Sequence, residues 1–279
     1  MMILLSALAL SLTSSSTTLA KALKLRGGDA VDVMTTASVG LQIVGGMYGC
    51  ADPAGNIRAF GGLSADAVIE PFEVAMMRYC ASQQVLAGCV LLSGQECDMR
   101  VAECVALTGN ALSFLTTPAY TSPGSARSAP LFAWLVTLAG LGEARRSEHP
   151  RAGTFGISLL GLAGLQAAVA PKACLDMYNS KQPASARALA FLSLGGANQL
   201  ASMVYIAVTG RAGRAGDGHA KGLLSFLCAN VAACAKFGLV DAERAGFQKF
   251  GALGWATIVS TWAAVVGARV ARGAKPKAS

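Results

Sequence analysis

The amino-acid sequence predicts an all-α integral membrane protein, a helical bundle of about eight spans built from two parallel four-helix repeats. Two observations predict the membrane location. Hydrophobic residues make up 53% of the 279 residues and charged residues only 14%, whereas a soluble domain carries about 25% charged residues. The mean hydropathy is +0.50. A third observation, the recurrence of polar residues in both halves of the chain, predicts the repeat.

The shortage of charged residues also excludes several classes of function. So few charges cannot cover a fold of this length in water, which excludes a soluble enzyme, a nucleic-acid binder and a disordered chain. The net charge is +8, but the basic residues lie in short gaps between apolar runs. We interpret them as a topology signal that also attracts anionic lipid headgroups. The expected partners are therefore the lipid bilayer and a membrane-protein complex, and not nucleic acid.

Residues 1–22 are predicted to be a signal or targeting peptide. The apolar run from Ile3 to Leu12 is too short to span a bilayer, and a Ser/Thr stretch ending in small residues follows it. A positively charged start is missing, so an amphipathic beginning of the mature protein is the alternative. The prediction is an integral membrane protein delivered by the secretory/ER route, with an organelle membrane as a second destination.

Eight apolar segments follow, and most have the ~17–25 residues that a spanning helix needs. They cover 33–50, 69–93, 99–118, 128–144, 153–170, 187–209, 220–238 and 248–268. Segment 128–144 is the weakest, at the lower limit of length. Breakers such as Asp52-Pro53 and Gln182-Pro183 lie in the gaps. We expect a first four-helix unit over 23–145, a second over 146–270, and a basic tail over 271–279.

Ordered polar matches between the two halves predict the internal repeat. Each half contains a Leu-Gln pair followed by Cys and Asp at the same spacing, a second-segment Gln eleven residues before a Gly, and a third-segment Asn. The residues are Leu41, Gln42, Cys50, Asp52, Gln83, Gly94 and Asn110, and then Leu165, Gln166, Cys174, Asp176, Gln199, Gly210 and Asn230. Chance similarity between apolar helices is the alternative. Because four is even, two such units run in the same direction across the membrane.

The distribution of Lys and Arg predicts the orientation. These residues are more numerous on the side that carries both termini, which the positive-inside rule places on the cytosol-like side. A cleaved secretory signal would instead leave the new N-terminus in the lumen. An uncleaved signal, a segment 128–144 that does not span, or re-targeting to an organelle each resolves the conflict. The second nearly erases the charge bias, so we favour the other two.

Ionisable residues at membrane depth are the first candidates for a site. Glu73 and Arg78 lie in the second segment, and Glu103 lies in the third. Charges within spans are costly and therefore indicate function or pairing. We expect Arg78 to pair with Glu73 or Glu103 in a structural ion pair, or to snorkel, with a solute or proton pathway as the second interpretation.

The other candidates are three pairs of repeated amides: Gln42 and Gln166, Gln83 and Gln199, and Asn110 and Asn230. Such side chains commonly hold membrane helices together. They are also suited to line a polar site at the repeat interface, where transporters bind substrate. We favour the first interpretation. The candidate intramembrane polar site consists of Arg78, Glu73, Gln83, Asn110, Gln199 and Asn230.

Cysteine and histidine give no sign of a cofactor or metal. The eight cysteines form no C-x-x-C pair and mostly lie in apolar segments, so we interpret them as small hydrophobes. A disulfide between Cys50 and Cys174 is an alternative in an oxidising lumen. His149 and His219 are expected to be solvated loop residues. We expect no catalytic residue, metal or cofactor, because no catalytic motif is present.

The first half resembles the small four-helix DoxX-like membrane proteins. The resemblance rests on Arg78-Tyr79 followed by Gln83-Gln84 in an apolar helix, after a first span that ends in a Pro-containing loop. In the second half, Arg187 opens the second span in the same way, although Leu194 stands at the position aligned with Arg78. The resemblance implies a four-helix fold used twice and carries no activity with it.

These observations leave three hypotheses for function. The favoured one is a non-enzymatic membrane component, such as a subunit, scaffold or assembly factor of a larger complex. The second is a transporter of small solutes or ions with a site at the repeat interface. The third, prompted only by the number of cysteines, is a membrane redox or lipid-modifying enzyme.

Overall fold

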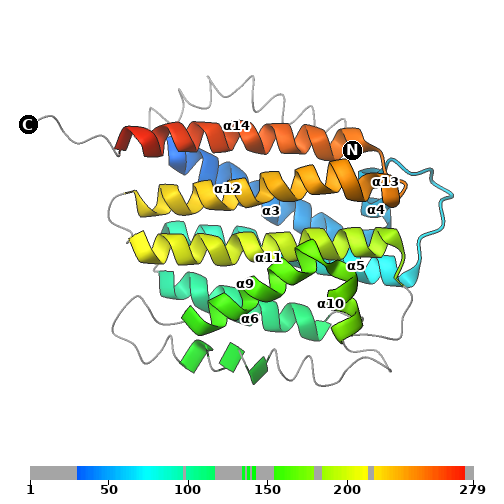
Figure 1. Ribbon diagram of the computed structural model, residues 1–279, viewed down its shortest axis with the longest axis horizontal. Coiled ribbons are helices and arrows are strands. Elements are labelled where there is room, and N and C mark those ends of the chain that lie inside the picture. The colour runs from blue at the N-terminus through cyan, green and yellow to red at the C-terminus, as the bar shows by residue number, and fades with distance from the viewer. Residues whose placement is uncertain are drawn as a thin grey trace, which may run out of the picture.

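The computed structural model describes residues 30–96, 99–116, 134–135, 137–138, 140–142, 154–178, 184–212 and 217–273. Every regular element in this part of the chain is helical. The long helices run side by side in a bundle (Figure 1). The predicted signal peptide, most of segment 128–144 and the last six residues of the basic tail lie outside the described residues.

The first half contains helices α3 (Ala30–Ala51), α4 (Pro53–Gly61), α5 (Pro71–Glu96) and α6 (Met99–Thr116). Helix α3 ends at Ala51 because Asp52-Pro53 starts a new helix. The Asp52 carboxylate accepts the backbone N–H of Gly55 at 2.9 Å, and Pro53 occupies the first turn, where a missing N–H costs nothing.

The second half repeats this order of a long helix, a short helix and further long helices. Its elements are α9 (Thr154–Val169), α10 (Pro171–Tyr178), α11 (Ala186–Ala212), α12 (Gly218–Lys236), the π-helical turn η1 (Phe237–Asp241), α13 (Ala242–Arg244) and α14 (Lys249–Gly273). Helices α9 and α10 are bent by 119° at the break before Pro171. Gly246 adopts a positive φ of 69° in the turn between α13 and α14, a conformation that favours glycine.

Three described helices are long and apolar enough to cross a membrane, and the bent pair makes a fourth if it counts as one span. They are Ala186–Gly210, Gly218–Arg244 and Gly251–Arg272, with Phe155–Val169 plus Pro171–Met177 as the bent pair. Several long apolar helices indicate a membrane-embedded protein. Helices α3, α5 and α6 are not among the helices that are long and apolar enough. In α5, the charged Arg78 and the two consecutive amides Gln83 and Gln84 lower the mean hydropathy.

Helices α5 and α11 lie at the centre and run parallel to each other. Glu73 near the start of α5 pairs with Arg187 near the start of α11. In the middle, the Tyr79 hydroxyl reaches Gln199. Towards the far end, Gly94 packs on the ring of Tyr205.

Helices α3 and α9 cross α5 and α11, respectively, through glycines that touch the neighbouring backbone. A Cβ atom added to Gly46 would lie 2.6 Å from the carbonyl oxygen of Ala81 and 2.8 Å from the backbone nitrogen of Val85. A Cβ atom added to Gly164 would lie 2.8 Å from the carbonyl oxygen of Gly196. Small residues are what allow membrane helices to approach this closely.

The structure places the equally spaced Cys50 and Cys174 in different surroundings. Cys50 is exposed near the end of α3, whereas Cys174 is buried in α10, beyond the helix break. Both are free thiols, so the alternative of a disulfide between them is not what the structure shows. The crossing glycines Gly46 and Gly164 are 118 residues apart, whereas Cys50 and Cys174 are 124 residues apart. The glycines and the cysteines therefore imply different alignments of the two halves.

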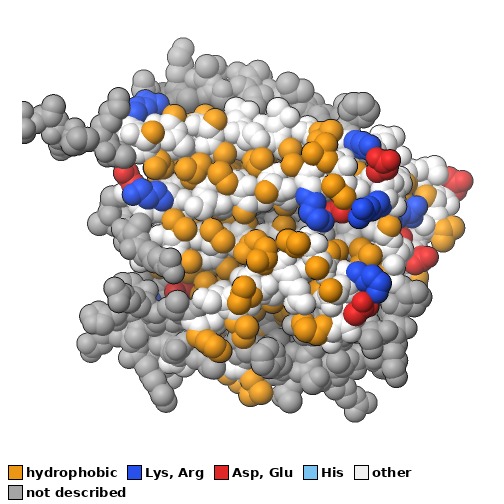
Figure 2. All heavy atoms as spheres, viewed as in Figure 1, with side chains coloured by type: hydrophobic (Ala, Val, Ile, Leu, Met, Phe, Trp, Pro, Cys, Tyr) orange, Lys and Arg blue, Asp and Glu red, His pale blue; other side chains and the backbone are white. Residues whose placement is uncertain are grey.

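On the face of the bundle seen in Figure 2, the middle is largely free of charged side chains, which gather towards the two ends of the helices. Exposed large hydrophobic residues occur on most of the long helices. They include Val44, Met47, Leu92, Leu112, Phe155, Leu162, Val169, Leu239 and Val265. Such a belt matches the hydrocarbon region of a bilayer better than it matches water.

Candidate functional site

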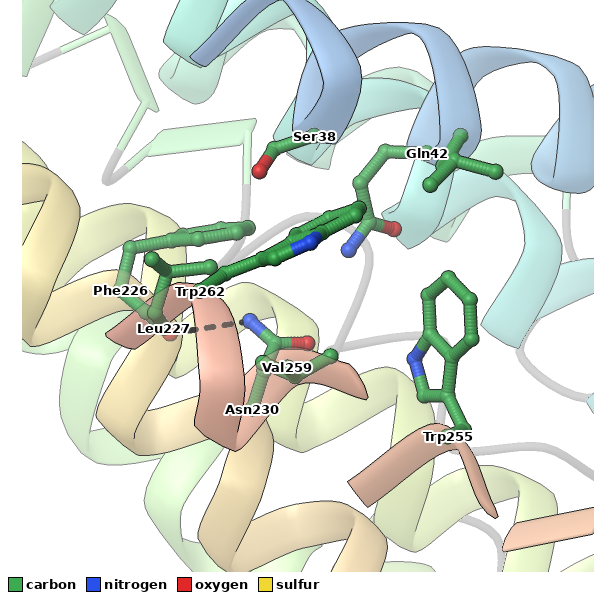
Figure 3. A pocket seen from close by; sticks show the side chains of 9 residues that line it. Ser38, Gln42, Phe226, Leu227, Asn230, Trp255, Val259 and Trp262 are labelled. Carbon is green, nitrogen blue, oxygen red and sulfur yellow. Dashed lines mark hydrogen bonds between the residues drawn. The ribbon is translucent and has the colours of Figure 1, made fainter. Parts of the chain in front are cut away.

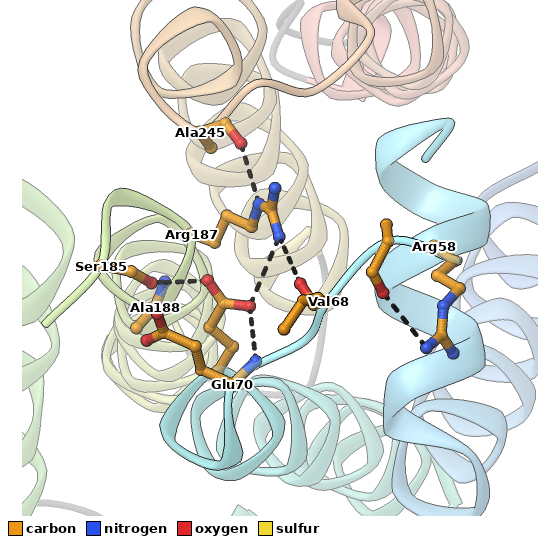
Figure 4. A network of polar contacts seen from close by, with 9 residues as sticks. Arg58, Val68, Glu70, Ser185, Arg187, Ala188 and Ala245 are labelled. Atoms are coloured by element: carbon orange, nitrogen blue, oxygen red, sulfur yellow. Dashed lines mark hydrogen bonds and ion pairs between the residues drawn. The ribbon is translucent and has the colours of Figure 1, made fainter. Parts of the chain in front are cut away.

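The buried carboxylate of Glu73 is the centre of a polar network where α5 and α11 begin. Figure 4 shows its partners Glu70, Ser185 and Arg187. Glu73 is 3% exposed. The Ser185 hydroxyl donates to its Oε1 at 2.7 Å, and the backbone N–H of Glu70 donates to its Oε2 at 3.1 Å. The Glu70 bond is the carboxylate half of a capping box, so it also fixes the start of α5.

Arg187 supplies the cation for this network. Its Nη1 lies 3.6 Å from Glu73 Oε2, and its guanidinium also donates to the carbonyl oxygens of Val68 and Ala245, each at 3.2 Å. One side chain thus connects α5, the loop before it and the turn after α13. Each of these bonds joins the chain to itself, so the network holds elements together.

Arg78 does not join this network, contrary to the expected pairing with Glu73 or Glu103. Arg78 is exposed on α5, and no ion pair within the described residues involves it. Five residues correspond to about 140° around a helix, so Arg78 and Glu73 point to different faces. Glu103 is buried on α6. Arg78 instead lies near Cys50 of α3.

Gln199 ties three helices together at the centre of the bundle. Its Oε1 accepts the Tyr79 hydroxyl of α5 at 3.0 Å, and its Nε2 donates to the carbonyl oxygen of Leu160 in α9 at 2.7 Å. Tyr79 and Gln199 are buried at 2% and 1% exposure. Both ends of this amide are used in contacts between helices.

Gln83 has a similar role in the first half. Its Nε2 donates to the Ser113 hydroxyl of α6 at 3.2 Å, and Ser113 lies 2.6 Å from the hydroxyl of Ser82. The Oε1 of Gln83 lacks a hydrogen-bond partner in the described part of the chain.

Asn110 and Asn230 make the same local bond in α6 and α12. The Nδ2 of each donates to the carbonyl oxygen four residues earlier, that of Ala106 at 2.8 Å and that of Phe226 at 3.0 Å. The Oδ1 of Asn110 has no partner within the described residues. Asn230 lines a pocket.

The six predicted site residues therefore do not converge on one site. Glu73 lies at one end of the bundle and Arg78 faces outwards. Gln83 bonds α5 to α6, whereas Gln199 bonds α11 to α5 and α9. Only Asn230 lines the described pocket.

This pocket, which we call the α3–α14 pocket, lies between α3, α12 and α14 (Figure 3). Its lining residues are Ser38, Leu41, Gln42, Phe226, Leu227, Asn230, Trp255, Val259 and Trp262. The inner cavity has a volume of about 10 Å³, which is the room of one water molecule. The hydroxyl of Ser38 and Oε1 of Gln42 are buried without a hydrogen-bond partner in the described chain.

Sequence reasoning missed Ser38 and the two indoles as parts of one site. A signal was present, because Thr35, Ser38 and Gln42 are spaced three and four apart and so share a helix face. All three are buried. What the spacing could not reveal is that this face meets α12 and α14, more than 180 residues away.

His219 is also placed differently from the expectation of a solvated loop residue. It lies in the first turn of α12, where Nδ1 is 2.9 Å from the Tyr205 hydroxyl and Nε2 is 3.1 Å from the Thr35 hydroxyl. Because the Thr35 hydroxyl donates to the carbonyl oxygen of Val31, it accepts from Nε2–H, and Nδ1 accepts from Tyr205. His219 thus connects α3, α11 and α12. His149 lies outside the described residues.

Within the described residues, no three His, Cys, Asp or Glu side chains come together in a way that could hold a metal ion. No family model, curated protein or solved structure matches this chain. The resemblance to DoxX-like proteins therefore stays a prediction from the residues quoted for it.

Proposed function

We propose that this chain is a non-enzymatic membrane component, a scaffold or assembly factor that acts by contacting other membrane proteins through its apolar flanks. The observation that carries the proposal is the use made of the buried polar side chains. Tyr79, Gln199 and Arg187 bond to other helices of the same chain, so the polar interior stabilises a framework. The large hydrophobic side chains of the lateral surface remain available to lipid or to neighbouring subunits.

Two parallel four-helix repeats are part of this proposal. Support comes from the matched crossings of Gly46 on α5 and Gly164 on α11, and from the matched amide bonds of Asn110 and Asn230. The central helices α5 and α11 run parallel, as they do when equivalent helices of two such units meet.

Eight spans are the second structural part of the proposal. Gln83 of α5 bonds to Ser113 of α6 and Leu86 packs on Gly109, so α5 and α6 are antiparallel. Gln199 of α11 bonds to Leu160 and Ser193 to Ala168, so α9 is antiparallel to α11. Helices α6 and α9 therefore point the same way, which supports a further crossing between them as part of the proposal. The contact of Thr137 with the Leu107 carbonyl, halfway along α6, supports a span over 128–144.

The route to the membrane is also part of the proposal. A peptide at 1–22 directs the chain through the secretory/ER route into a bilayer, with an organelle membrane as the alternative. The resemblance to DoxX-like proteins supports the four-helix unit and assigns no chemistry.

Native extraction in mild detergent tests the proposed function. The particle released from the source cell is sized by native mass, and its subunits are identified. A particle much larger than two chains, with defined co-purifying membrane proteins, is expected. A particle that always contains one or two copies of this chain alone, in several mild detergents, contradicts the scaffold role.

A transporter of small neutral solutes is the second candidate, favoured by the unpartnered polar atoms of the α3–α14 pocket. Light-scattering measurements of glycerol and urea entry into proteoliposomes test it. Entry faster than in empty liposomes, and abolished by Gln42→Leu and Asn230→Leu at unchanged protein levels, supports transport. Entry equal to that of empty liposomes removes this candidate.

A further inference from the structure

The α3–α14 pocket contains hydrogen-bonding atoms at membrane depth that the chain itself does not satisfy. Ser38 and Gln42 are 3% and 8% exposed. Neither Ser38 Oγ nor Gln42 Oε1 has a hydrogen-bond partner in the described part of the chain. Both side chains project from α3 towards the indole of Trp262 (Figure 3). Burying such atoms unpaired is unfavourable, so a small group that bonds to both is stabilised there.

The size and charge of the pocket limit what this group can be. Its inner volume of about 10 Å³ holds a single oxygen-sized group. None of the nine lining residues is charged. An ion would therefore enter without a countercharge at a depth where that is costly. The occupant is therefore neutral and donates a hydrogen bond to Gln42 Oε1, and the Ser38 hydroxyl is able to donate to it.

The walls of the pocket are suited to contact the hydrocarbon part of a molecule whose polar group lies in the pocket. The rings of Trp255 and Trp262 meet edge to face, with centroids 6.4 Å apart. Leu41 and Trp255 are half-buried at the edge of the pocket. Gly45 lies one turn after Leu41, and no other part of the described chain comes within 4 Å of where its Cβ would stand.

A polar helix face also leads to the pocket from one end of the bundle. Thr35 and Ser38 lie on one face of α3, and Thr35 contacts His219 in the first turn of α12. His219 is half-buried at this end. Polar groups therefore line this face of α3 from the end of the bundle to Ser38.

We propose that the α3–α14 pocket binds a hydroxyl group, supplied by a membrane-soluble alcohol or by a water molecule. The Gln42 Oε1 accepts the proton of the bound hydroxyl, and the Ser38 hydroxyl donates to its oxygen. The indoles of Trp255 and Trp262 pack against the carbon chain of an alcohol. This site goes beyond the proposed assembly role and does not depend on it.

Tryptophan fluorescence tests the alcohol as the source. The chain has three tryptophans, so a Trp134→Phe variant in lipid nanodiscs reports only on the two indoles of the pocket. The probes are 11-bromo-1-undecanol and 1-bromoundecane, which share a quenching bromine and differ in the hydroxyl. Saturable quenching by the alcohol, with linear quenching by the alkane, is expected. In Ser38→Ala and Gln42→Leu the alcohol concentration for half quenching rises about fivefold or more.

Exchange of H₂O for D₂O tests water as the source, because indoles in contact with exchangeable water emit more strongly in D₂O. A D₂O effect that decreases in Ser38→Ala and Gln42→Leu, without selective quenching by the alcohol, assigns the site to water. Gln166→Leu on α9 is the matched control and leaves both readouts unchanged.

Equal saturation behaviour of the two bromo compounds, together with the same D₂O effect in all variants, overturns the proposal. Ser38→Ala removes a single oxygen and keeps the test available if Gln42→Leu does not fold. The particle size that tests the scaffold role is a separate measurement, so the two proposals fail separately.

Discussion

At the scale of single residues, the buried charge of Glu73 is balanced by groups from other elements. Ser185 and Glu70 donate to its two oxygens, and Arg187 supplies the cation. A carboxylate at 3% exposure needs these partners, because an uncompensated buried charge is strongly destabilising. Arg78 is exposed and has no corresponding role.

The first prediction compares the two arginines. We expect Arg187→Ala to lower the free energy of unfolding in mild detergent by about 1–3 kcal/mol, because it leaves Glu73 buried without a cation. Arg78→Ala should change it by less than about 0.5 kcal/mol, as for an exposed side chain. SDS titration followed by circular dichroism measures both. Equal effects of the two substitutions would show that Arg187 does not compensate Glu73.

The second prediction concerns the central amide. Tyr79→Phe removes one bond to Gln199 and should cost about 0.6–1.7 kcal/mol. Gln199→Leu also leaves the Leu160 carbonyl without its donor, so it should cost more than Tyr79→Phe. The double variant should cost less than the two single variants together, because they share one bond. Additive losses in the same SDS titration would argue against the Tyr79–Gln199 bond.

At the scale of elements, the approach of α3 to α5 and of α9 to α11 is set by glycines in contact with backbone. A carbonyl oxygen cannot turn aside as a flexible side chain can. Any side chain at Gly46 or Gly164 therefore pushes whole helices apart.

The third prediction tests these crossings. Gly164→Ala should destabilise the fold by about 1–3 kcal/mol, because its Cβ would lie 2.8 Å from the Gly196 carbonyl oxygen. Gly40→Ala on α3 is the matched control: among the residues that the structure describes, no atom outside the adjoining helix backbone lies within 4 Å of its Cβ position, so alanine should be neutral or slightly stabilising. Thermal unfolding in detergent compares them. A Gly164→Ala protein as stable as the Gly40→Ala protein would refute the close crossing.

At the scale of the whole molecule, successive long helices within each half of the described chain run in opposite directions, which fixes the end of the bundle at which each of them begins. Asp66 lies in the loop before α5 and Arg272 near the end of α14. Gln248, just before α14, donates its backbone N–H to the Gly61 carbonyl oxygen, so α14 begins at the end of the bundle where α4 ends. Arg272 is therefore at the opposite end from Asp66.

The fourth prediction follows from this arrangement. In a cysteine-free background, Arg272→Cys should react with an impermeant maleimide from the cytosol-like side of sealed vesicles, as the positive-inside rule requires. Asp66→Cys should react only after the vesicles are permeabilised. Labelling of both positions from the same side would disprove the crossing order. Retained function in the cysteine-free chain would also remove the redox hypothesis.

The sequence by itself determined the helical, membrane-embedded character and most helix boundaries, because hydropathy and proline act locally. Asp52-Pro53 ends α3 where the sequence expects a break. Only the tertiary structure decided that Glu73 pairs with Arg187 and not with Arg78, because their distance in space depends on how α11 packs on α5. It also decided that Gly46 and Gly164 make the matching crossings, and that Ser38, Gln42 and Asn230 share a pocket. Contacts between distant helices depend on shape complementarity, which spacing along the chain does not encode.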